Sequence, residues 1–87
     1  MRYHRNGKVL AQPLDDQVIL LSADRSDLLT LNGSGAAVWE ALAEPGTVEE
    51  VTARILGSWP GADSSVVRAD VVAFLDQLIT LGAVEAA

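Results

Sequence analysis

The chain has 87 residues, a formal net charge of −6 and no cysteine. This length fits one domain and not two, and the lack of cysteine excludes disulfides, thiolate metal sites and cysteine nucleophiles. We therefore expect a single domain over residues 1–87, with residues 1–7 frayed, in a reducing compartment such as the cytoplasm. The longest apolar run, Val18–Leu21, is far short of the roughly 20 residues that a membrane span needs, so no membrane contact is expected.

The first third of the sequence predicts three short strands. Residues 8–12 form a β candidate, and Pro13 either ends it or lies on a sheet edge, because proline cannot donate to a β-ladder. Val18–Leu21 is apolar and partly β-branched, and a polar connection of hairpin length separates it from Leu28–Leu31. Three strands with tight polar turns are typical of an antiparallel meander.

Beyond the third strand the apolar period becomes helical, and three helices are predicted. The segment Asn32–Gly35 breaks the strand pattern and offers N-cap residues for a first helix that ends before Pro45. Thr47 and Glu50 have the spacing of a capping box, which marks the start of a second helix. The predicted fold class is therefore α+β, with a three-stranded antiparallel sheet followed by three helices.

The third helix is predicted to be the longest. Asp63, Ser64 or Ser65 can cap its start, and Gly82 is suited to the position after its end. Its apolar stripe is wider than a helix needs to pack against one core, which indicates a second apolar neighbour or a missing one. Residues 83–87 form a short tail that could add one more strand.

Residue types that carry chemistry are scarce. The one histidine, His4, lies in the segment expected to be frayed, so zinc sites are not expected. Ser34 lies between two glycines but lacks the spacing of a nucleophile turn and a downstream histidine, which favours helix capping. We expect no catalytic residue, no metal and no cofactor. Trp39 and Trp59 fall on core-facing helical positions, where each either packs in the core or forms a pocket wall.

The third strand, Leu28–Leu31, carries leucines on both of its faces. As the last strand of a meander it would be an edge, and it has no proline or lysine to guard that edge against pairing with another chain. An unguarded strand edge beside a helix whose apolar stripe is wider than core packing needs favours binding of a peptide by strand addition. The same edge could pair two copies of the chain in a weak homodimer.

Three segments, in order, resemble the PqqD-like domains. Leu31–Leu42 is similar to the family's hallmark, in which a strand ends in Leu-Asn before a small-residue turn and a helix that carries Val-Trp. Thr47–Val51 is similar to the start of the family's second helix. Asp70-Val71, Phe74-Leu75, Leu78 and Gly82 are similar to its third-helix pattern. The resemblance covers residues 8 to 84, nearly the whole chain.

The resemblance implies a winged helix-turn-helix-like fold with a leader-peptide groove between the third strand and the third helix. It implies a RiPP recognition element, which binds the leader of a ribosomally made precursor peptide and presents it to a leader peptidase, with a cyclase that acts either later or in the same assembly. With Trp39, and without Cys-Asp-Gly after the first helix, the chain resembles the standalone domains of lasso-peptide pathways more than the protein of the quinone-cofactor pathway. The expected peptide-binding residues are Leu28, Leu29, Thr30, Leu31, Val67, Arg68, Val71, Val72 and Leu75. Arg68 either pairs with a leader carboxylate or is simply solvated.

Two other functions remain open from the sequence. A winged-helix DNA-binding regulator would share the fold, but the six basic residues are scattered along an acidic chain, and phosphate binding needs them together. A nucleic-acid partner is therefore not expected. The chain could also be an interaction subunit of an unrelated enzyme.

Overall fold

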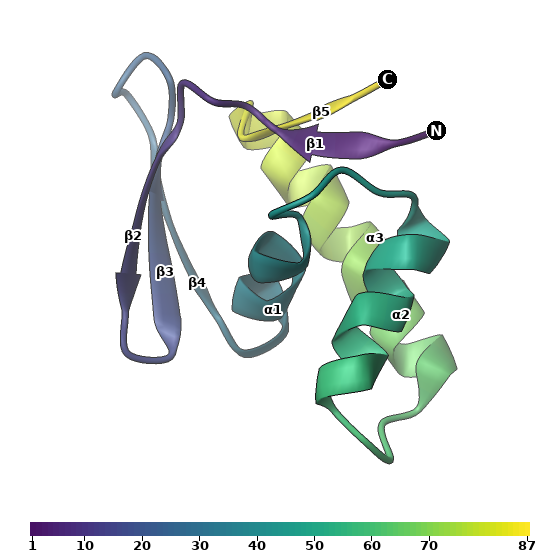
Figure 1. Ribbon diagram of the computed structural model, residues 1–87. Helices are drawn as coiled ribbons and strands as arrows, with labels where there is room; N and C mark the ends of the chain where they lie inside the picture. Colours follow the sequence, from purple (N-terminus) through teal and green to yellow (C-terminus); the bar gives the residue numbers. More distant parts are fainter.

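The computed structural model describes all 87 residues and contains five strands and three helices, which Figure 1 labels. In chain order they are β1 (Tyr3–Arg5), β2 (Leu10–Leu14), β3 (Gln17–Leu21), β4 (Leu28–Asn32), α1 (Gly33–Ala41), α2 (Val48–Ser58), α3 (Ser64–Leu81) and β5 (Val84–Ala86). A three-stranded antiparallel sheet, β2-β3-β4, precedes the helices. This arrangement confirms the α+β fold that the sequence predicts.

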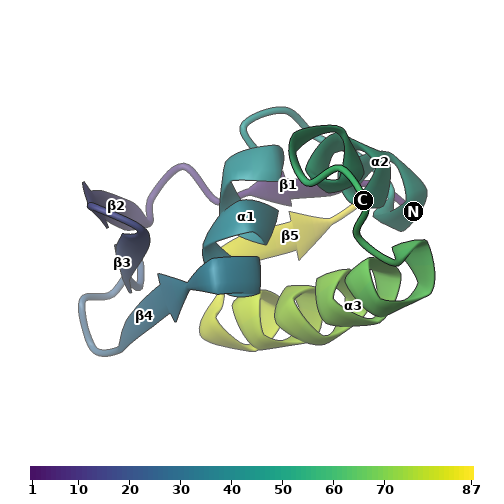
Figure 2. The ribbon, with the colours of Figure 1, turned by 90° about the horizontal axis from the view of Figure 1, so that it is seen from below.

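The three-stranded sheet has one buried face and one exposed face. Across β3 and β4, Val18 pairs with Leu31 and Leu20 pairs with Leu29, and these side chains point toward the helices, where all but the half-buried Leu29 are fully enclosed. The opposite face carries a cross-strand row of three leucines, Leu10, Leu21 and Leu28. The β2-β3 hairpin projects away from the helices (Figure 2).

One residue of β2 shows how the sheet protects its first edge. The strand runs over Leu10–Leu14, two residues later than predicted, so Pro13 lies inside it and not after it. In the ladder Pro13 is opposite Val18. Because β2 is an outer strand, proline is tolerated at a position whose backbone nitrogen points away from the sheet, where no ladder hydrogen bond is lost.

The helices bury one face each against a shared core of 14 buried residues. The stripe of α3 supplies Val67, Val71, Leu75 and Leu78 to this core, as its apolar spacing predicts. The predicted capping box is present at α2, where the Glu50 amide donates to Thr47 Oγ1 over 3.1 Å and the Thr47 amide donates to Glu50 Oε1 over 2.9 Å. These bonds satisfy amides that the first helical turn would otherwise leave unpaired.

The two ends of α3 are fixed by the residues predicted for them. The Asp63 carboxylate accepts from the Ser65 amide over 2.9 Å at the start of the helix. Gly82 follows its end with a φ of 83°, a left-handed conformation that glycine adopts without a steric penalty.

Gly35 allows α1 and α3 to approach closely. A Cβ atom built at this position would lie 2.7 Å from Cε1 of Phe74, which is well inside van der Waals contact. The small-residue turn before α1 is thus a packing requirement as well as a break in the strand pattern. Asn32 occupies the N-cap position of α1, but its side chain makes no capping hydrogen bond.

The expectation of a frayed N-terminus is wrong for residues 3–5. They form β1, which pairs with β5 in the register Tyr3–Ala86, His4–Glu85 and Arg5–Val84. Tyr3 also exchanges two backbone hydrogen bonds with Gly46, of 2.8 and 3.0 Å. A three-residue strand shows no periodicity in sequence, and its partner is about 80 residues away, so local reasoning could not detect it.

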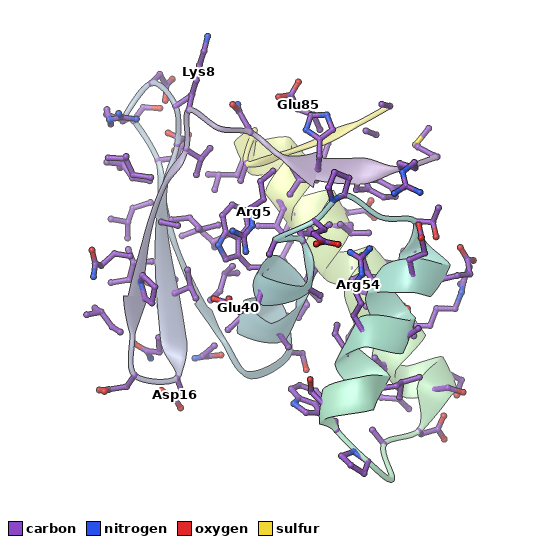
Figure 3. All side chains as sticks on the ribbon, in the orientation of Figure 1. Arg5, Lys8, Asp16, Glu40, Arg54 and Glu85 are labelled. Atoms are coloured by element: carbon purple, nitrogen blue, oxygen red, sulfur yellow. The ribbon has the colours of Figure 1, made fainter.

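Arg5 ties this small sheet to α1. Its Nε donates to the carbonyl oxygen of Trp39 over 3.2 Å, and its guanidinium carbon lies 4.3 Å from the centroid of the Trp39 ring. Partial burial lowers the pKa of Arg5 from its ordinary value, and the nearby Glu40 opposes that shift. Figure 3 shows Arg5 directed toward α1.

Of the two roles predicted for each tryptophan, Trp39 packs in the core and Trp59 forms part of a pocket wall. Trp39 is 4% exposed, and Trp59 is 38% exposed. Because α2 ends at Ser58, Trp59 is its C-cap residue with a φ of −123°, and its side chain no longer follows the helical stripe. None of the helices is both long and apolar enough to span a membrane.

Candidate functional site

The outer edge of β4 has no strand partner. In the order β2-β3-β4 one side of β4 pairs with β3 and the other side pairs with nothing. The Ser22 amide donates to the Asp27 carbonyl over 2.9 Å, so Ser22 and Asp27 form a hydrogen-bonded pair of the β3–β4 hairpin. Because such pairs alternate along an antiparallel ladder, Leu29 and Leu31 direct their N–H and C=O groups at β3. Leu28 and Thr30 therefore direct theirs outward, where a further strand would bind.

The two edges of this sheet differ in protection. The same alternation, carried across to β2, turns the backbone of Pro13 outward, so the β2 edge lacks one of the donors that a pairing strand needs. On β4 the corresponding outward positions are Leu28 and Thr30, both exposed and both with free N–H groups. A peptide strand can therefore add to β4 with its hydrogen bonds intact, but not to β2.

A groove separates the start of β4 from the end of α3. It encloses about 520 Å³, and we call it the β4–α3 groove. Its lining residues come from the segment before and within β4 and from the last two turns of α3, and they are Asp27, Leu28, Leu29, Asp76, Gln77, Thr80 and Leu81. Figure 2 shows β4 near the C-terminal end of α3.

Several of the predicted peptide-binding residues lie at this groove or on its edge. Leu28 and Leu29 line it, and Thr30 lies on the free edge of β4. Leu28 is 65% exposed, so it has apolar surface available to a ligand. Leu31, by contrast, is 2% exposed and belongs to the core.

The residues predicted on α3 do not line the groove. Val67, Val71 and Leu75 are at most 6% exposed, because the apolar stripe of α3 is used to pack the helix on the core. They hold the wall of the groove in place from behind. The surface available to a ligand comes from the flank of the helix beside that stripe.

Arg68 and Val72 of α3 do not line the groove. At roughly 100° per residue, Arg68 is about 180° around the helix from the lining residue Gln77, whereas Val72 is about 40° from Asp76, one turn before it. The Arg68 guanidinium instead donates to Glu49 of α2 over 3.2 Å at the surface. Arg68 is therefore not in a position to meet a peptide lying against β4.

Sequence reasoning missed five lining residues of the β4–α3 groove: Asp27, Asp76, Gln77, Thr80 and Leu81. A signal for them was present, because Leu81 widens the apolar stripe of α3 toward one side and Gln77 precedes it by one helical turn. Following that side back along the helix identifies the flank that faces β4. The residues of the buried stripe were predicted to bind the peptide because regularly spaced apolar residues fit both core packing and a peptide-binding wall.

The loop before β4 is held by an ionised aspartate. Asp24 Oδ1 accepts from Ser26 Oγ over 2.7 Å, from Ser22 Oγ over 2.8 Å and from the Ser26 amide over 3.1 Å. These hydrogen bonds, that of the Ser26 hydroxyl foremost, lower the pKa of Asp24 to about 2. Since hydrogen bonds to the charged form stabilise it, the loop is fastened at neutral pH and holds Asp27 and Leu28 at one end of the groove.

A second hollow, of the same volume, lies between α1 and α2. It also encloses about 520 Å³, and its lining includes Glu40, Glu44, Arg54 and Trp59. It borders no strand edge, and the Arg54 guanidinium at its side is occupied by the carbonyl oxygens of Ala41, Glu44 and Pro45 at 2.9 to 3.0 Å. The β4–α3 groove is therefore the better candidate for peptide binding.

No group of three or more histidine, aspartate or glutamate side chains lies close enough together to hold a metal ion. The site offers backbone donors and acceptors, apolar side chains and two carboxylates. Its chemistry is that of a binding surface for an extended peptide.

Comparison with known families matches residues 17–84 to the model of Coenzyme PQQ synthesis protein D, PqqD. The match spans β3 to the start of β5 and includes both sides of the β4–α3 groove. The chain belongs to the PqqD family. A search of curated protein sequences finds no match to this PqqD-family chain.

The fold of this PqqD-family chain matches a solved structure, that of TbiB1 in complex with the TbiA(beta) leader peptide. The TM-score is 0.81 and the sequence identity 25%, and the match covers 97% of this chain and 96% of the TbiB1 chain. The match therefore extends beyond residues 17–84, the region that the family model covers.

Proposed function

We propose that this chain binds the leader segment of a ribosomally made precursor peptide and has no catalytic role of its own. The leader adds as a fourth strand beside β4, on the outward N–H and C=O groups of Leu28 and Thr30. One set of its side chains enters the β4–α3 groove against Leu29 and Leu81, and the alternate set covers Leu28 on the other face of the sheet. The observation that carries the proposal is the unguarded β4 edge beside this groove, in a chain whose fold matches a leader-peptide complex.

The finer parts of the proposal concern the pathway. We propose a RiPP recognition element of a lasso-peptide pathway, with the bound leader presented to a leader peptidase and then to a cyclase. The support for this assignment is the resemblance of the Trp39 segment and the lack of Cys-Asp-Gly after α1. A chain that only binds would separate recognition of the precursor from cleavage, so the peptidase need not recognise the whole leader itself.

The gains and the costs of strand addition are of similar size. An apolar anchor that becomes fully buried contributes about 1.5–3 kcal/mol, and each strand hydrogen bond contributes about 0.5–1.5 kcal/mol net. Association opposes these gains by about 4–15 kcal/mol, and ordering of the leader opposes them by about 2–5 kcal/mol. The affinity therefore depends on how well the leader's anchors fit the groove.

The DNA-binding alternative has weaker support. The arginines, which would have to contact phosphates, are engaged in the protein: Arg2 with Glu50, Arg68 with Glu49, and Arg5 and Arg54 with backbone carbonyls. Arg25 likewise donates to three carbonyl oxygens of its own loop and of Lys8. A duplex would meet an acidic surface with one free lysine, Lys8, which points outward in Figure 3.

The direct test is a titration by fluorescence polarisation. The probe is the labelled leader of a short precursor encoded beside this chain, titrated into the protein and into Leu28→Gln. Leu28 is 65% exposed, so burial under a leader gains free energy that glutamine cannot supply, and we expect binding at least about fivefold weaker.

Leu14→Gln is the matched control, since Leu14 is 47% exposed on β2, the guarded edge. It should bind as the unaltered protein does. Sedimentation at the concentrations used checks that two copies do not compete for the same edge. Equal weakening by both variants, or no saturable binding by the folded protein, would refute the proposal.

A further inference from the structure

The β4–α3 groove carries negative charge that the protein does not neutralise. Asp27 lies at its β4 side and Asp76 at its α3 side, and both carboxylates are exposed. Neither forms a salt bridge, since the two ion pairs of the chain are Arg2–Glu50 and Arg68–Glu49. The hydrogen-bond partner nearest to the Asp27 carboxylate is the Ser26 hydroxyl at 3.4 Å, and that hydroxyl donates its one hydrogen to Asp24 over 2.7 Å.

The basic residues are held away from this charge. Arg25 is two residues from Asp27 in sequence, but its φ of 64° and its three carbonyl acceptors direct its guanidinium back toward the chain at Lys8, Ser22 and Ala23. Arg68 does not line the groove and pairs with Glu49 of α2. The groove therefore presents two carboxylates, a glutamine, a threonine hydroxyl and three leucines to whatever occupies it.

These observations determine the chemistry of the occupant. A strand added to β4 places alternate side chains on opposite faces, so one set enters the groove toward Leu29 and Leu81 and the other set lies over Leu28. A side chain at the rim between Asp27 and Asp76 meets two negative charges and no positive one. An acidic residue there is repelled, and a lysine or arginine, with an apolar stem to lie along the leucines, is favoured.

We propose that Asp27 and Asp76 determine specificity, by selecting a leader that carries a lysine or arginine next to its apolar anchor. This inference rests on the proposed function, and it names the leader's charge pattern. The effect is modest because both carboxylates are solvated. Solvated ion pairs contribute little, and we expect neutralising both carboxylates to weaken the binding of such a peptide by about threefold to tenfold.

The test uses a phage-displayed library of random 12-residue peptides selected on the immobilised protein. Peptides that also bind Thr30→Pro are discarded, which keeps those that need the free edge of β4. The selection is repeated on Asp27→Asn/Asp76→Asn and on Asp15→Asn/Asp16→Asn. The second variant removes the same charge from the β2–β3 turn, where Figure 3 places Asp16 at the far tip of the hairpin.

The inference predicts that the retained peptides share an apolar residue with a lysine or arginine at a fixed spacing. That basic preference should disappear on Asp27→Asn/Asp76→Asn and persist on Asp15→Asn/Asp16→Asn. A synthetic copy of the best peptide should lose about threefold to tenfold in affinity when its basic residue becomes glutamine, and less in higher salt.

Two other outcomes separate the inference from the proposed function. Peptides that need the β4 edge but show no basic preference, or keep it on Asp27→Asn/Asp76→Asn, would overturn the inference and leave strand addition standing. If no peptide distinguishes the protein from Thr30→Pro, peptide binding at β4 is itself refuted, and the inference with it.

Discussion

Replacing Thr30 by proline is expected to weaken leader binding at least tenfold while the fold persists. Thr30 is exposed at the middle of β4, and the hydrogen-bond alternation turns its N–H away from β3. Proline removes that donor and places its ring where the leader's carbonyl would lie. A buried carbonyl left without its partner costs about 1–3 kcal/mol, and the ring adds a steric conflict.

The fold should tolerate this change because the sheet already contains such a residue. Pro13 occupies an outward-facing position in β2, the opposite edge strand. Thr30→Val is the matched control, since it keeps the backbone N–H and the β-branched shape and should bind normally. Polarisation titrations measure the affinity, and circular dichroism with thermal unfolding checks the fold. Normal affinity in a folded Thr30→Pro protein would place the leader elsewhere.

Trp39→Ala is expected to destabilise the protein by about 3–5 kcal/mol. Trp39 is 4% exposed in the core, and its ring also lies under the Arg5 guanidinium that fastens β1 to α1. Removing the ring leaves a cavity and loosens both the small sheet and the helix that follows β4. Domains of this size have roughly 4–13 kcal/mol in total by the usual per-residue scale, so the variant should be marginally folded.

Trp59→Ala provides the matched control for this prediction. Trp59 is 38% exposed at the end of α2, so the same deletion should cost at most about 2 kcal/mol. Urea unfolding of the two variants and the unaltered protein measures both costs. Comparable losses for the two tryptophans would contradict the distinction between a core ring and a surface ring.

The elements that sequence reasoning located are those with local signals. The apolar period of α3, the capping box at Thr47 and Glu50, and Gly82 at a helix end all lie within a few residues of what they determine. The third strand was identified because Leu28–Leu31 is apolar between a polar turn and a helix start, and its place at the sheet edge followed from chain order.

The features that escaped depend on contacts distant in sequence. The pairing of Tyr3–Arg5 with Val84–Ala86 joins the two ends of the chain. Which flank of α3 faces β4 depends on how the helix is rotated on the core, and the periodicity of a helix does not say what lies beside its buried stripe. For that reason the prediction assigned Val67, Val71 and Leu75 to the groove and overlooked Asp76 and Gln77.

Amide hydrogen exchange, followed by NMR with and without saturating leader, tests the strand-addition account most directly. The account predicts that the amides of Leu28 and Thr30 exchange freely in the unbound protein and become protected when the leader binds. Those of Leu29 and Leu31, already directed at β3, should change little. Saturable binding that leaves the exchange of Leu28 and Thr30 unchanged would contradict leader recognition at the β4 edge.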